Sequence, residues 1–201
     1  MSPELRFLAL GDSYTIGEGV ADAERWPNQL AARLHLAAPE VIARTGWTTD
    51  ELAAAMDAYA FAPPYALVTL LVGVNNQYRN RDLANYRAEF TQLLRRAIML
   101  AAGTPQHVLV VSIPDWSVTP FARASGRDLA QVAREIDAFN AAKAQIAAAL
   151  HAGYADVTAI SRDRGGDAEM LVDDDLHPSA AMYTRWLEAI LPAASRALAD
   201  R

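Results

Sequence analysis

The chain has 201 residues and a mass of 21.8 kDa, and 52% of its residues are hydrophobic while 21% are charged. This length and balance predict a soluble globule that forms a single domain over residues 1–201. The absence of cysteine excludes disulfides, thiolate metal sites and cysteine nucleophiles. A net charge of −6 and an isoelectric point near 5.2 argue against a nucleic-acid partner.

No apolar run approaches the roughly 20 residues that a membrane-spanning helix needs. The residues before the short apolar run Phe7–Leu10 contain no basic segment, and no small-residue cleavage site follows it. We therefore expect no signal peptide and a cytoplasmic location.

Short β-type runs alternate with longer helical patterns along the whole sequence. The third and fourth runs contain ALVTLLV and HVLVVSI, nearly continuous apolar stretches that are typical of parallel strands covered on both faces. The alternation predicts a three-layer α/β fold around a parallel sheet. The expected strands are Leu5–Leu10, Glu40–Ala43, Tyr65–Val72, His107–Ile113 and Tyr154–Thr158.

Apolar residues at helical spacing predict two long helices, within residues 83–100 and 129–150. The second stripe is interrupted by Lys143, which is the only lysine of the chain. Small polar residues followed by acids at Thr48–Glu51 indicate the start of another helix.

The last helix is expected to follow His177-Pro178-Ser179, with the proline tolerated in its first turn. Pro192 is expected to kink or break that helix. The polar stretch Ser161–His177 is expected to form one long loop.

A polar motif follows each expected strand. Because the carboxyl ends of parallel strands meet at one edge of a sheet, where ligands bind, these motifs are expected to lie together. In chain order they are Gly11-Asp12-Ser13, Thr45-Gly46-Trp47, Gly73-Val74-Asn75-Asn76, Pro114-Asp115-Trp116 and Asp173–Pro178.

These motifs contain the groups that acyl transfer needs. A serine hydroxyl such as that of Ser13 becomes a useful nucleophile when an imidazole takes its proton, and His177 is the only histidine expected at this edge. Asp174 precedes it by three residues, close enough to orient the imidazole. The backbone N–H groups of Ser13 and Gly46 and the side-chain amide of Asn75 are candidate oxyanion donors.

Each motif also has a simpler structural interpretation. Asp12 or Ser13 can cap a helix, Gly46 can serve a turn, and the acidic run at 173–175 can be a solvated loop. These interpretations would have to coincide at four strand ends, so the sequence favours a functional site.

Four blocks resemble the SGNH (GDSL-type) hydrolase family in their order and spacing. The resemblance extends from Leu8 to about Ser179. It implies a flavodoxin-like sheet of order 2-1-3-4-5 and ester hydrolysis without a metal or other cofactor. The blocks are Gly11-Asp12-Ser13, Gly46, Gly73-x-Asn75 and Asp174-x-x-His177.

Carried over residue by residue, the resemblance implies that Ser13 is the nucleophile, His177 the base and Asp174 its orienting carboxylate. Gly46 and Asn75 match the oxyanion donors. Members of the family act on acyl esters, thioesters and acetylated sugars. A serine esterase is therefore expected, with short-chain acyl, aryl or acetyl esters as its substrates, and a thioesterase or lysophospholipase is the alternative.

The chain departs from the family pattern at Asn76, where many members carry aspartate, and at Tyr14, where the family name records leucine. The first change is expected to weaken the bracing of the loop. The second places a ring beside the nucleophile, where it can line or restrict the acyl site.

Aromatic residues beyond the strand ends are candidates for the substrate wall, although such residues also pack into cores. Arg79 and Arg81 are candidates for contact with an anionic leaving group, or are solvated. The aromatic candidates are Tyr14, Trp47, Tyr78, Trp116 and Phe121.

Other classes of protein fit the sequence less well. An acidic metal or phosphoryl site would use Asp12, Asp115 and Asp173–Asp175, but its usual lysine partner is missing, because Lys143 lies within a predicted helix. No Lys-Ser/Thr follows the glycines at 11–19, which excludes a phosphate loop, and the serine is not in a G-x-S-x-G elbow. A non-catalytic binding module on the same scaffold is the third alternative. Asp115 is expected to orient an arginine or a backbone loop.

Overall fold

The computed structural model describes residues 5–199 and contains a five-stranded parallel sheet of order β2-β1-β3-β4-β5. This architecture and strand order confirm the prediction. The fifth strand is shorter than expected, because the N–H of Thr158 donates to Asp156 Oδ1 at 2.8 Å and opens a helix there. The strands are β1 Phe7–Gly11, β2 Glu40–Ala43, β3 Leu67–Leu71, β4 Val108–Val111 and β5 Gly153–Ala155.

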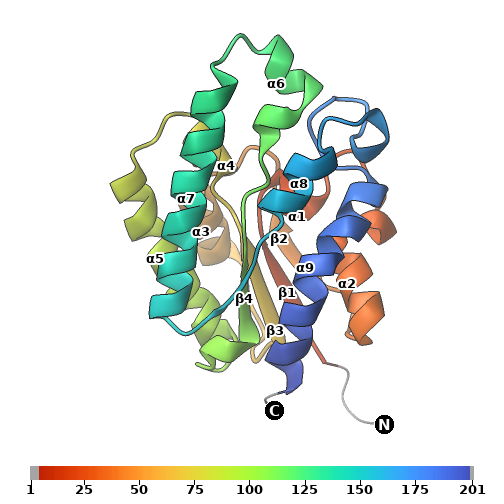
Figure 1. Cartoon of the computed structure of the whole chain (residues 1–201). Helices are drawn as coiled ribbons and strands as arrows, with labels where there is room; N and C mark the ends of the chain where they lie inside the picture. Colours follow the sequence, from red (N-terminus) through yellow and green to blue (C-terminus); the bar gives the residue numbers. More distant parts are fainter. Residues whose placement is uncertain (1–4, 200–201) are drawn as a thin grey trace.

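Long helices cover both faces of the sheet (Figure 1). Helices α2 Trp26–Leu34 and α9 Ala180–Ala199 pack together on one face, and α3 Thr49–Ala58, α5 Leu83–Leu100 and α7 Leu129–Ala149 cover the other. Shorter elements follow the strand ends or connect the helices. They are α1 Ser13–Ile16, η1 Asp22–Glu24, α4 Val74–Tyr78, η2 Pro105–His107, η3 Trp116–Val118, α6 Pro120–Ala124, α8 Thr158–Arg164 and η4 Ala168–Met170.

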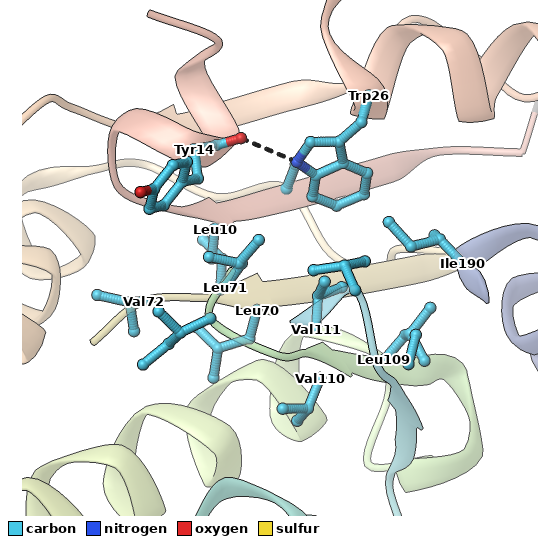
Figure 2. Close-up of a cluster of buried hydrophobic side chains, with 14 of the residues drawn as sticks. Leu10, Tyr14, Trp26, Leu70, Leu71, Val72, Leu109, Val110, Val111 and Ile190 are labelled. Atoms are coloured by element: carbon cyan, nitrogen blue, oxygen red, sulfur yellow. Dashed lines mark hydrogen bonds between the residues drawn. The ribbon is translucent and has the colours of Figure 1, made fainter. Parts of the chain in front are cut away.

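The central strands are buried on both faces, as their continuous apolar runs predict (Figure 2). Leu10, Leu70 and Val110 are each completely buried, and burying one such leucine contributes about 1.5–3 kcal/mol. Above this cluster the indole N–H of Trp26 donates to the Tyr14 carbonyl at 3.0 Å, which ties α2 to the chain that leaves β1.

The two long apolar stripes form α5 and α7 as predicted, but Lys143 does not interrupt the buried face of α7. Its side chain is completely buried, and its Nζ donates to the Val111 carbonyl at 2.5 Å. The same nitrogen lies 5.5 Å from the centre of the Phe90 ring. A long side chain with one hydrogen bond and a ring beneath it can therefore occupy a core position.

The C-terminal part of the chain differs from the prediction in three respects. The stretch Ser161–His177 is not one loop, because it contains the end of α8 and all of η4. The last helix begins at Ala180, so Pro178 precedes it instead of lying in its first turn. Pro192 does not break α9: it lies on the exposed face, and the buried side chains on either side of it keep the helix packed on the sheet.

Within residues 5–199, no helix combines the length and the apolar character that crossing a membrane requires.

Candidate active site

The chain leaves β1 through a helix start that fixes Ser13 at the sheet edge. Asp12 is the N-cap of α1, and its Oδ1 accepts a hydrogen bond from the Tyr14 N–H at 3.1 Å. The capping interpretation of Asp12 is therefore confirmed, and it places Ser13 at the first position of the helix. Burial raises the pKa of Asp12 to about 7, although the Tyr14 hydrogen bond and the charge of Lys143 lower it.

His177 lies in a short closed loop. The Val172 N–H donates to the His177 carbonyl at 2.9 Å, and Leu171 forms an antiparallel bridge with Pro178. This pairing brings residues 172 and 177 together and leaves Asp174 inside the turn between them. The last part of the predicted loop is thus a turn with its own backbone hydrogen bonds.

Asp174 contacts His177 at two points. Its Oδ2 lies 2.5 Å from His177 Nδ1, and its Oδ1 accepts hydrogen bonds of 2.9 Å from the backbone N–H groups of Leu176 and His177. Partial burial raises the pKa of the Asp174 carboxyl, but these hydrogen bonds outweigh it and leave the pKa below its ordinary value. The carboxylate is therefore ionised and holds the imidazole at its Nδ1 edge.

The loop after β2 presents Gly46 with a φ of +88°, a conformation that favours glycine. Neighbouring elements hold this loop from several sides: Arg79 Nη2 donates to the Gly46 carbonyl at 2.7 Å, and Asn75 Nδ2 donates to the Trp47 carbonyl at 2.9 Å. The Thr45 hydroxyl also bonds to Glu18. The backbone around Gly46 is therefore fixed by side chains.

Asn75 follows a glycine that the packing requires. Gly73 has a φ of +135°, and a Cβ at that position would lie 2.6 Å from the hydroxyl of Tyr86. Asn76, which follows Asn75, accepts a hydrogen bond from the Thr49 N–H at 3.1 Å and donates one to the Thr49 hydroxyl at 2.7 Å. These two bonds join α4 to the start of α3. A weaker bracing than aspartate would give stays a prediction.

One pocket of about 240 Å³ brings four of the predicted groups together: Ser13, His177, Gly46 and Asn75. Asp174 does not line it and lies behind His177. Both Ser13 and His177 are well buried, and among the hydrogen bonds of residues 5–199 none joins the Ser13 hydroxyl to the imidazole. The complete lining is Ser13, Tyr14, Thr45, Gly46, Val74, Asn75, Tyr78, Trp116, Phe121, Leu176 and His177.

Four of the five predicted wall residues line this pocket, and Trp47 does not. The side chain of Trp47 packs half-buried against the hydrophobic core, which removes it from the wall. The ring of Trp116 lies 5.5 Å from that of Tyr78 and 6.2 Å from that of Phe121, so these three form one continuous aromatic surface.

Sequence reasoning missed three lining residues, Thr45, Val74 and Leu176. Each is a direct neighbour of a predicted site residue. Proximity in the sequence was therefore the available signal, but it does not tell which neighbour points toward the pocket.

The sequence profile of the GDSL-like lipase/acylhydrolase family matches residues 9–185. The chain belongs to this family. As a GDSL-family protein it is a hydrolase that acts on ester bonds. No curated protein matches the chain significantly.

Solved structures share the fold of this family member. The crystal structure of TesA is 23% identical, covers 96% of this chain and 99% of its own, and superposes with a TM-score of 0.72. An extracellular lipase from Streptomyces rimosus is 20% identical, with 96% of this chain and 99% of the lipase covered and a TM-score of 0.72. Phospholipase A1 from Streptomyces albidoflavus NA297 is 19% identical, with 96% of this chain and 98% of the phospholipase covered and a TM-score of 0.69. At these identities the likeness concerns the fold.

The two arginines near the site of this hydrolase are engaged by neighbouring groups. Arg79 bonds to the Gly46 carbonyl and to Glu51, and Arg81 pairs with Asp50 at 2.5 Å. Because both guanidinium groups already have acidic partners, the structure does not favour them as receptors for an anionic leaving group.

The aspartates of the alternative metal site are held in separate places. Asp115 accepts from the Ser117 N–H at 2.9 Å and pairs with Arg162 at 2.7 Å, so it orients an arginine and a backbone turn as predicted. Asp12 caps α1, and Asp174 contacts His177. Within the part of the chain that the structure describes, no group of three or more histidine, aspartate or glutamate side chains is arranged to hold a metal ion.

Proposed function

We propose that this family member hydrolyses carboxylic esters, with short-chain acyl, aryl or acetyl esters as substrates, by means of a Ser13-His177-Asp174 triad. The observation that carries the proposal is the 2.5 Å contact between Asp174 Oδ2 and His177 Nδ1. The imidazole of His177 lines the same pocket as Ser13. A carboxylate at Nδ1 fixes the tautomer in which Nε2 is free to accept a proton.

In the proposed reaction, His177 Nε2 accepts the proton of Ser13 Oγ while that oxygen attacks the ester carbonyl carbon. The tetrahedral intermediate collapses, the bond to the alkoxy oxygen breaks, and the imidazolium returns the proton to the leaving alcohol. Water then attacks the acyl-enzyme in the same manner and releases the acid. The Asp174 carboxylate stabilises the imidazolium in both halves.

Three donors are proposed for the oxyanion: the N–H groups of Ser13 and Gly46 and the side-chain amide of Asn75. An amide nitrogen carries two hydrogens, and the Trp47 carbonyl takes one from Asn75. The other is available for the pocket, while the first bond keeps the amide in place. The positive φ of Gly46 and its bond to Arg79 keep the second donor fixed before the substrate arrives.

The reaction also needs a hydrogen bond between Ser13 Oγ and His177 Nε2. Such bonds are often long in a free enzyme and tighten in the substrate complex. We propose that this one forms as the ester displaces water from the pocket.

The test is hydrolysis of p-nitrophenyl acetate by the wild type and by Ser13→Ala. Loss of the nucleophile is expected to lower kcat by about 10⁴- to 10⁶-fold. Ser125→Ala is the matched control, because Ser125 is exposed and does not line the pocket, and it should retain wild-type activity. A Ser13→Ala enzyme with unaltered turnover would overturn the proposal, as would failure of a serine-directed phosphonate to label Ser13.

The same triad would support thioesterase or lysophospholipase activity. A panel of nitrophenyl esters, acetylated sugars, acyl-CoA thioesters and lysophospholipids, each compared with Ser13→Ala, ranks these substrate classes by kcat/KM.

A further inference from the structure

A second cavity, of about 20 Å³, lies next to the pocket that contains Ser13. We call the pocket of about 240 Å³ the outer pocket and this second one the inner cavity. Tyr14, Trp116 and Leu176 line both, so their side chains form the wall between the two spaces. Behind the wall the inner cavity is bounded by mostly apolar side chains, among them Leu171, Met182 and Trp186.

Tyr14 is a buried part of this wall and packs against two other rings. The residue is 3% exposed, and the centre of its ring lies 5.6 Å from that of the His177 ring and 6.1 Å from that of the Trp186 ring. Its backbone is fixed at both ends, because its N–H bonds to Asp12 and its carbonyl accepts from Trp26 (Figure 2). The ring is therefore held by its packing, and the backbone that carries it is held by two hydrogen bonds.

The other two members of the wall are positioned differently. Trp116 is tied through its indole N–H, which donates to Gln77 Oε1 at 2.9 Å, so its removal would leave a buried acceptor unpaired. Leu176 is half-buried and lies in the turn that also carries Asp174 and His177. Tyr14 is thus the wall residue that is next to Ser13 in the chain, and its ring separates the two spaces together with the side chains of Trp116 and Leu176.

We propose that Tyr14 determines the acyl-chain specificity of this hydrolase, by confining the acyl group to the outer pocket. The inference rests on the proposed function, since it takes the acyl group to be attached to Ser13. A short acyl group fits within the outer pocket, whereas a longer chain meets the Tyr14 ring. With a smaller side chain at position 14 the two apolar spaces join, and a longer chain can extend toward Leu171 and Met182.

The experiment compares kcat/KM for p-nitrophenyl butanoate and octanoate in the wild type and in Tyr14→Leu. The wild type is expected to prefer butanoate. Tyr14→Leu is expected to raise the octanoate-to-butanoate ratio by about tenfold or more, the scale on which apolar pockets discriminate between chains. Leucine remains apolar at this buried position, and a cooperative thermal transition verifies that the variant is folded.

A second substitution tests whether the gain comes from the inner cavity. Leu171→Phe fills that cavity from its far side, and Leu171 does not line the outer pocket. Alone it should leave the octanoate-to-butanoate ratio at the wild-type value, and combined with Tyr14→Leu it should cancel most of the gain. If Tyr14→Leu fails to fold, Leu176→Ala opens the same wall from its half-buried side and should shift the ratio in the same direction.

Two results overturn the inference. One is a folded Tyr14→Leu enzyme, or Leu176→Ala in its place, with the wild-type ratio. The other is a double variant that keeps the full gain. In both cases the hydrolysis of butanoate by the wild type still supports the proposed function. A wild type that hydrolyses no ester of the panel would instead remove the proposed function, and this inference with it.

Discussion

Asp12 precedes Ser13 in the chain and Asp174 contacts His177, and the environments of the two aspartates differ. Asp174 is partly exposed, and hydrogen bonds from its own turn keep its pKa below the ordinary value despite partial burial. Asp12 is completely buried, and burial raises its pKa to about 7. Asp174 contacts the imidazole that lines the pocket, whereas Asp12 caps the helix that carries Ser13.

This difference shows that a perturbed pKa can reflect burial alone as well as a role in the reaction. A strongly perturbed pKa often marks a reacting group, yet here the larger pKa change belongs to Asp12, which caps α1, and not to Asp174, which contacts the imidazole. Burial explains the raised pKa of Asp12, and the explanation needs no role of Asp12 in the reaction. The carboxylate in contact with the imidazole is recognised by geometry, since it must be ionised and placed at Nδ1. The same isosteric change at each aspartate therefore tests the distinction.

Of the two aspartates, Asp174 is expected to show the larger effect on activity when it is changed to asparagine. The amide keeps the shape and one acceptor, but it no longer stabilises the imidazolium or selects the tautomer, so kcat should fall by about 10⁴-fold. The measurement is steady-state hydrolysis of p-nitrophenyl acetate. Asp173→Asn is the control, because Asp173 is an exposed neighbour that does not line the pocket, and it should retain wild-type kcat. Retention of more than about a tenth of the activity by Asp174→Asn would contradict the assigned role of that carboxylate.

A smaller effect on activity is expected for Asp12→Asn. The asparagine Oδ1 can still accept the Tyr14 N–H, so Ser13 stays in place and kcat should fall by about tenfold, the equivalent of one weakened hydrogen bond. The KM for p-nitrophenyl acetate should hardly change. A loss as large as that of Asp174→Asn would mean that the charge of Asp12 acts in the reaction.

The stability of Asp12→Asn should also respond differently to pH. Between the ordinary aspartate pKa of 3.8 and about 7, the folded protein keeps a proton on Asp12 that the unfolded chain has released. This group therefore makes the wild type less stable as the pH rises through that window. Asp12→Asn lacks it, so urea unfolding at pH 4.5 and pH 7 should show the variant gaining free energy of unfolding relative to the wild type.

Much of the fold and the centre of the site could be predicted because they depend on short-range patterns. Apolar runs located the five strands, and the strand-end rule assigned Ser13, Gly46 and Asn75 to one edge. The sheet order came from the family resemblance. The contact between Asp174 and His177 spans three residues, so one turn of backbone was enough to predict it.

The remaining features depend on contacts between distant segments. The bond from Arg79 to Gly46 joins residues 33 positions apart, and the bond from Lys143 to Val111 joins residues 32 apart. No local pattern states which of two partly apolar side chains turns inward, which is why Trp47 was assigned to the wall and Leu176 was not. The inner cavity is lined by residues of α9, of η3 and of the turn that carries His177, which are distant in the chain, so it leaves no trace in the spacing of residues.

The smallest effect on activity is expected for Lys143→Met, which tests the buried charge that accompanies Asp12. Lys143 does not line the pocket, so kcat should stay within about twofold of the wild type. Its effect lies in the stability. Burial lowers the pKa of Lys143 from 10.5 to about 7, while the nearby Asp12 raises it, so above about pH 7 the unfolded chain holds a proton that the folded protein has released. The wild type must therefore gain stability as the pH rises through this window, and methionine removes that gain.

Urea unfolding of the wild type and Lys143→Met at pH 8 and pH 10 measures this difference. Both values lie above the pKa of Asp12, so that group contributes little to the change. The wild type should gain free energy of unfolding relative to the variant between the two values. Parallel behaviour would show that the Lys143 ammonium is ionised across this range in the folded protein. The hydrogen bond to Val111 and the charge of Asp12 would then offset the cost of burying the Lys143 ammonium. In that case burial alone would not explain why the pKa values of Asp12 and Asp174 differ.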